Sequence, residues 1–152
     1  MRKIITSFLL SSIIMTGSSC FGALSVDHLM LGEIKYGATI SDVEKQYGKP
    51  LKIDRDTEPS GEKIEYKYGN SIEFEFINGK LHEITVEDKS NAKTKAGVGI
   101  GTDVTTLKSI YGEPDKIHEE DYIYFIEGMQ GIGLKFEIRN GKVHEISCGL
   151  LD

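Results

Sequence analysis

Hydrophobic residues recur at or close to a period of two along six stretches of the chain. In the first of these stretches, Ile64, Tyr66 and Tyr68 are separated by charged residues. Strict alternation is typical of a β-strand that buries one face and exposes the other to water. The stretches predicted as strands are residues 64–68, 72–76, 81–87, 122–127, 132–139 and 143–148.

Short turn sequences join these strands. Asn78-Gly79 and Asn140-Gly141 are the strongest short hairpin signal, because both residues adopt positive φ angles readily. Gly69-Asn70 is a further two-residue turn. We therefore predict two antiparallel meanders of three strands each.

A helical period precedes each meander. Apolar residues recur at helical spacing within residues 40–47 and 104–111. Thr39 and Asp103 stand at the N-cap positions, and Asp42 follows Thr39 at the spacing of a capping box. A glycine that ends the helix and a proline that blocks its continuation follow each segment: Gly48 and Pro50, Gly112 and Pro114.

The two sets of elements match each other in sequence. A shift of 64 positions aligns residues 34–53 with 98–117 and gives six identities in twenty positions. A shift of 62 positions aligns residues 72–84 with 134–146, and eight of thirteen positions are identical. Since chance does not produce two such matches in the same order, we predict an internal repeat.

The predicted class is α+β, with two tandem helix-plus-antiparallel-meander repeats whose helices pack on one face of the sheet or sheets. The first repeat is placed at 29–88, a polar linker at 89–96 and the second repeat at 97–152. Residues 54–63 are predicted to be a loop, after a short strand at Lys52-Ile53. Because each repeat is small, we expect them to pack together in a continuous sheet of six to eight strands.

The N-terminus has the plan of a secretory signal peptide. A basic start is followed by a short apolar run over residues 4–15 and then by small residues up to Gly22. We predict removal of residues 1–22 and a periplasmic or secreted protein. The alternative is a lipoprotein anchored to the cell envelope, with Cys20 as the lipidated first residue.

Net charge restricts the possible partners. The formal charge of the chain is −6, and loss of Arg2 and Lys3 with no acid gives −6 − 2 = −8 for the mature form. Such a chain is repelled by phosphate backbones and by anionic lipid surfaces. We therefore expect no nucleic-acid partner, and a membrane association only through a lipid on Cys20.

The glycine, the capped helix ending in Tyr-Gly-x-Pro, the meander and the Asn-Gly-Lys hairpin resemble the envelope repeats of the BamE (SmpA/OmlA) superfamily. Two such units in tandem resemble the β-lactamase inhibitory protein fold, over about residues 31–148. This resemblance implies a scaffold that binds other proteins and has no catalytic residues. The chain departs from those inhibitors because Cys148 is the only cysteine after residue 22, so no internal disulfide is expected.

The candidate partner-binding residues are Ile123 and Phe125. They alternate with Tyr122, Tyr124 and Ile126, so a helix that covers the tyrosines leaves Ile123 and Phe125 exposed on the sheet. Large exposed apolar residues often mark a contact surface. Coverage by the first repeat or by the linker is the alternative.

Other candidate chemistry is weak. His82 and His144 occupy equivalent positions, but no cluster of further ligands accompanies them, so no metal site is predicted. Glu73, Glu75 and Glu83 are read as alternating charges on a solvated sheet face rather than as catalytic acids. Without an identifiable nucleophile and base, we expect no enzyme, no catalytic residues and no cofactor.

Two functional hypotheses follow. The first is an exported, non-enzymatic protein-binding module, acting as an inhibitor of a secreted hydrolase or as an envelope-assembly accessory. Its partner is expected to be another protein in the envelope or outside the cell. The second is a periplasmic receptor for a small ligand or metal, using the groove between the repeats with His82 or His144.

Overall fold

A computed structural model describes residues 24–151; the predicted signal peptide and Cys20 lie outside this range. The elements, in chain order, are the 3-10 helix η1 (Val26–His28), β1 (Met30–Leu31), β2 (Ile34–Lys35), α1 (Ile40–Tyr47), β3 (Lys52–Glu58), β4 (Gly61–Tyr68), β5 (Ile72–Ile77), β6 (Lys80–Glu87), α2 (Val104–Tyr111), β7 (Lys116–His118), β8 (Asp121–Phe125), β9 (Ile132–Arg139) and β10 (Lys142–Leu150).

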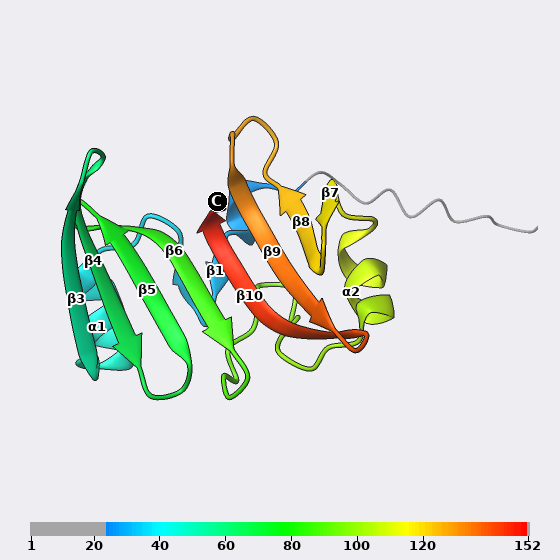
Figure 1. Cartoon of the computed structure of the whole chain (residues 1–152), viewed down its shortest axis with the longest axis horizontal. Helices are drawn as coiled ribbons and strands as arrows, with labels where there is room; N and C mark the ends of the chain where they lie inside the picture. The colour runs from blue at the N-terminus through cyan, green and yellow to red at the C-terminus, as the bar shows by residue number, and fades with distance from the viewer. Residues whose placement is uncertain (1–23, 152) are drawn as a thin grey trace, which may run out of the picture.

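Eight of these strands form one antiparallel sheet in the order β3-β4-β5-β6-β10-β9-β8-β7, and β1 pairs with β2 separately. In Figure 1 the sheet lies nearest the viewer, with α1 and β1 behind it. The predicted class of two helix-plus-meander repeats is therefore wrong. The protein is mostly β, with two short helices against a single large sheet, because direct pairing of β6 with β10 merges the two sets of strands.

Strand β3 is the largest local departure from the prediction. Residues 54–63, predicted as a loop, form most of β3, the turn at Pro59-Ser60 and the start of β4. Six of the seven residues of β3 are exposed, so the strand has no alternation of apolar and polar positions. Hydrophobic periodicity cannot detect such a strand.

The two helices are confirmed, and they begin differently. The Thr39 side chain accepts a hydrogen bond from the backbone N–H of Asp42 at 3.2 Å, and the Asp42 carboxylate accepts one from the Thr39 N–H at 2.9 Å. Asp103 makes no such cap, because its carboxylate accepts a hydrogen bond from the Lys142 ammonium at 2.8 Å. Of these two α-helices, only α1 therefore has a capping box.

The seam between β6 and β10 joins residues that are 58 to 66 positions apart in the chain. Ile84 and Val86 of β6 face Cys148 and Ile146 of β10 across the seam, and all four side chains are buried in the common core. On the other side of the sheet the hydroxyls of Thr85 and Ser147 lie 3.4 Å apart. The seam therefore joins β3–β6 and β7–β10 over one continuous core.

The segment between β6 and α2 packs against the body of the protein. Ala92 and Thr94 are buried, and the Tyr111 hydroxyl donates a hydrogen bond to the Thr94 hydroxyl at 2.8 Å. The division of the chain at residues 89–96 stays a prediction.

Cys148 is buried completely in this core, and burial raises the pKa of its thiol to about 12. Because the thiolate is the reactive form, we expect no reaction with a thiol-specific disulfide reagent under native conditions. The full signal should appear after unfolding in guanidinium chloride, which is the control. Rapid reaction of the folded protein would contradict this packing.

Candidate functional site

The candidate site is the face of the eight-stranded sheet opposite the helices, called here the open face. Within residues 24–151, no helix or strand lies over it (Figure 1). Its side chains alternate with the core residues along each strand. The residues that define the open face include Lys52, Asp54, Asp56, Glu58, Lys63, Glu65, Lys67, Glu73, Glu75, Ile77, Glu83, Thr85, Glu87, Lys116, His118, Asp121, Ile123, Phe125, Gly133, Lys135, Glu137, Arg139, Glu145, Ser147 and Gly149.

The two predicted partner-binding residues lie on this face but are not equally accessible. Ile123 is only 7 % exposed, whereas Phe125 is half-buried. Ile123 sits in register between Lys116 and Lys135, whose long side chains flank it. The expectation that both residues are exposed is therefore wrong for Ile123, because neighbouring side chains on the same face screen it.

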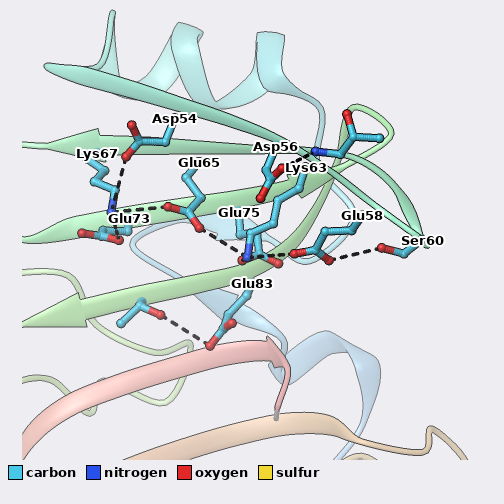
Figure 2. A network of polar contacts seen from close by, with 12 residues as sticks. Asp54, Asp56, Glu58, Ser60, Lys63, Glu65, Lys67, Glu73, Glu75 and Glu83 are labelled. Carbon is cyan, nitrogen blue, oxygen red and sulfur yellow. Dashed lines mark hydrogen bonds and ion pairs between the residues drawn. The ribbon is translucent and has the colours of Figure 1, made fainter.

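A first row of carboxylates crosses four strands in register. Asp54 of β3 faces Glu65 of β4, which faces Glu75 of β5, which faces Glu83 of β6. Figure 2 shows these four side chains with the lysines that run between them. We call them the first acidic row.

Two lysines bridge the first acidic row. The Lys63 ammonium lies 2.7 Å from Glu75, 3.3 Å from Glu65 and 3.6 Å from Glu58. Lys67 lies 3.3 Å from both Glu65 and Glu73 (Figure 2). The hydrogen bond to Glu75 is the main cause of the raised pKa of Lys63.

Carboxylates nevertheless outnumber cations on this half of the open face. The lysines that contact the network are Lys52, Lys63 and Lys67. The carboxylates are Asp54, Asp56, Glu58, Glu65, Glu73, Glu75 and Glu83. Seven negative groups against these three lysines leave an excess of negative charge, so this surface favours a cationic partner.

A second row of carboxylates crosses the other half of the sheet. Glu87 of β6 faces Glu145 of β10, which faces Glu137 of β9, which faces Asp121 of β8. Burial is the main cause of the raised pKa of Glu145, and the facing carboxylates raise it further, while Lys135 acts in the opposite direction. We call these four residues the second acidic row.

Bare backbone separates the first acidic row from Phe125. Along the line that continues from Glu83, Gly149 faces Gly133 and Gly133 faces Phe125. A Cβ atom on Gly149 would lie 2.1 Å from the His82 carbonyl oxygen, so the two backbones approach too closely for a side chain. The line thus runs from carboxylates over glycines to an aromatic ring.

Sequence reasoning recognised some of these acids but missed the rows. Glu73, Glu75 and Glu83 were interpreted as alternating charges on a solvated face, and the structure places all three on the open face. The rows depend on the cross-strand register, including an irregularity after Glu75 and the pairing of β6 with β10. Neither has a local sequence signal.

The histidines of the alternative hypothesis have partners of other kinds. The His82 ring lies 6.1 Å from the Tyr36 ring, and His144 Nε2 lies 2.8 Å from an Asp88 carboxylate oxygen. Among residues 24–151 no group of three or more His, Cys, Asp or Glu side chains could hold a metal ion. A hollow of about 550 Å³ on the helix side is lined by Glu33, Gln46, Tyr47, Lys93 and Thr94, and by neither histidine.

Two solved structures are similar to this chain. An extracellular protein containing an SCP domain, from Bacillus anthracis, matches with a TM-score of 0.53 and 10% sequence identity, over 97% of this chain and 49% of that one. A cysteine-rich secretory protein from Staphylococcus aureus matches with a TM-score of 0.43 and 9% identity, over 74% of this chain and 43% of that one. The chain thus spans about half the length of the first solved structure.

Comparison with protein-family models gives no match, and comparison with curated proteins gives none either. The predicted resemblance to BamE and to the β-lactamase inhibitory protein fold is wrong, because the fold matches part of an SCP-domain protein instead. The residues that suggested it are helix ends and hairpin turns. Such residues specify local geometry that many folds share.

The described helices are all short. Within residues 24–151 none is long and apolar enough to cross a membrane.

Proposed function

We propose that this protein is an exported, non-enzymatic module that binds a partner protein through the open face of its sheet. The observation that carries the proposal is a face of eight strands that no described element covers and that bears two acidic rows. Like charges directly opposite each other lower the stability of a sheet, so their presence in two rows favours a role in binding.

Three features support export and a basic partner. The N-terminal sequence has the plan of a signal peptide. The solved structure with a similar fold belongs to an extracellular protein. The excess of carboxylates around Lys63 and Lys67 matches a partner surface rich in lysine and arginine, because opposite charges steer association and fix orientation.

The partner surface also needs an apolar contact. Phe125 is half-buried at the end of the glycine line, and its ring offers contact area next to bare backbone. Aromatic residues at the centre of an interface frequently contribute most of the binding energy. An inhibitor of a secreted hydrolase and an envelope-assembly accessory would both use such a surface.

The test is a comparison of retained proteins rather than a single capture. The tagged chain beginning at Ala23 is exposed to envelope and culture-supernatant fractions, in parallel with a Glu73→Gln/Glu83→Gln variant and with Phe125→Glu. We expect a partner retained by the parent chain to be depleted about tenfold or more by either change, which corresponds to ~1.4 kcal/mol of binding.

The matched control is Asp27→Asn/Glu127→Gln, which changes the net charge equally at exposed positions outside the sheet. It should retain the partner as the parent chain does. Equal retention by the open-face variants and the control would remove the open face from the interaction. Circular dichroism establishes that each variant is folded.

A further inference from the structure

Strand β3 ends the sheet on one side, and its outer edge is unpaired within residues 24–151. All seven residues of β3 pair with β4, from Lys52 opposite Lys67 to Glu58 opposite Gly61. Alternate residues of a strand direct their N–H and C=O groups away from the paired neighbour. Strand β3, at one margin of the sheet in Figure 1, therefore presents a row of backbone groups that no other strand pairs within residues 24–151.

The two edges of the sheet differ in length. β7, at the opposite edge, has three residues, and short edge strands are one way in which proteins avoid pairing with other chains. β3 has seven residues and six of them are exposed. The short length that protects the β7 edge against pairing with another chain therefore does not protect β3.

The two sides of β3 have different chemistry. Asp54, Asp56 and Glu58 alternate on the side of the open face. On the helix side Ile53 is 43 % exposed, and Leu51, just before the strand, is 80 % exposed. A strand added at this edge would thus place one row of side chains beside carboxylates and the other row beside apolar groups.

A second copy of this chain fits the edge poorly. Antiparallel pairing of β3 with itself over its full length places Asp54 opposite Asp56 and Arg55 opposite Arg55 of the second copy, and only the end pair of Lys52 and Glu58 has opposite charges. Like charges directly opposite each other destabilise a strand pair. The charges of β3 therefore act against self-association while leaving the edge open to a strand of complementary sequence.

We propose that the β3 edge binds an extended segment of another protein as a ninth strand, with lysine or arginine at alternate positions facing Asp54, Asp56 and Glu58. Apolar residues of the segment lie between these positions and contact Ile53. Main-chain hydrogen bonds supply affinity in this mode, and the alternating side chains supply specificity. This inference goes beyond the proposed function, because it concerns main-chain pairing at the sheet edge. It shares Asp54, Asp56 and Glu58 with the open face, and Thr57→Pro distinguishes strand addition from binding on that face.

Thr57 gives a direct way to block the edge. Its backbone N–H donates a hydrogen bond to the Asp56 carboxylate at 2.7 Å, so this donor is bonded outside the β3–β4 ladder. Proline at position 57 removes the donor and places a ring at the outer edge, where proline is tolerated in sheets. Thr57→Ala retains the N–H and serves as the matched control.

The experiment measures binding of a fluorescent peptide, in which lysine alternates with valine, to the chain beginning at Ala23. We expect Thr57→Pro, and separately Asp54→Asn/Asp56→Asn, to weaken binding about tenfold or more, while Thr57→Ala changes it less than about twofold. The peptide with glutamate in place of lysine should not bind. Asp27→Asn/Glu127→Gln again controls for net charge.

Two outcomes would overturn the proposal. The first is unchanged peptide binding by a folded Thr57→Pro variant. The second is peptide binding that is lost in Glu73→Gln/Glu83→Gln but kept in Thr57→Pro, because this result would place the peptide on the open face. A second measurement covers the case of an unfolded variant. Hydrogen exchange of the β3 amides in the parent chain should slow with saturating lysine peptide, and unchanged exchange there would contradict strand addition.

Discussion

Replacing Gly149 with alanine is expected to lower the free energy of unfolding by about 3 kcal/mol. Gly149 lies in β10 at the seam with β6, opposite Glu83. Its φ of 133° is a conformation that residues with a side chain rarely adopt. An alanine Cβ would also lie 2.1 Å from the His82 carbonyl oxygen, so backbone strain and a backbone clash act together.

Two further glycines separate these effects. Gly141, in the Asn-Gly turn, has a φ of 73° and open space around its Cβ position, so Gly141→Ala tests strain alone. The Cβ position of Gly133 lies 2.1 Å from the Tyr124 carbonyl oxygen, so Gly133→Ala tests the clash between β8 and β9. Urea denaturation should rank Gly149→Ala as the most destabilising of the three. If Gly149→Ala lowers the free energy of unfolding no more than Gly141→Ala does, the strands at the seam can move apart to accommodate the Cβ atom with no loss of stability.

Local signals explain why some elements could be predicted from sequence. The capping box of Thr39 and Asp42 and the turn at Asn78-Gly79 use contacts between residues close in the chain. The free energy of such motifs depends little on the rest of the fold. Helix α1 and the hairpin between β5 and β6 were therefore predicted within a few residues.

The missed features depend on contacts between distant residues or on the position of a strand in the sheet. β3 lies at the edge, where neither face is buried, so its sequence has no hydrophobic period. The Thr85–Ser147 contact joins residues that are 62 positions apart. Ile123 was expected to be exposed because its face is open, but the register places it between two lysines.

The two acidic rows could not be predicted for the same reason. Each of their residues occupies a polar position that is ordinary in an alternating strand. Only the cross-strand register places four such residues opposite one another. Lys63 and Lys67 neutralise much of the first acidic row. The second acidic row also has two cations close by, because Arg139 forms an ion pair with Glu137 and Lys135 lies near Glu145. At Glu145, however, burial and the neighbouring carboxylates outweigh Lys135, so its pKa is raised.

Replacing Glu145 with glutamine should therefore stabilise the protein at neutral pH, by on the order of 1 kcal/mol from the like-charge pairs removed. Because burial and the facing carboxylates raise the pKa of Glu145, its charged form is disfavoured in the folded state. The charge thus lowers stability in full above the raised folded-state pKa, and the penalty is lost as pH falls from that pKa to below the ordinary pKa of glutamate.

Thermal unfolding of both proteins between neutral and acidic pH checks this expectation. The stability advantage of Glu145→Gln should be largest at neutral pH and should vanish once the parent Glu145 is protonated. Glu75→Gln is the matched control on the same face, and it should destabilise the protein, because Glu75 lies 2.7 Å from the Lys63 ammonium.

Both variants should bind a basic partner more weakly, since both remove a carboxylate from the open face. A mutation that stabilises the fold and weakens binding would link the second acidic row to function, whereas a less stable Glu145→Gln at neutral pH would show that these carboxylates support the sheet and remove that link.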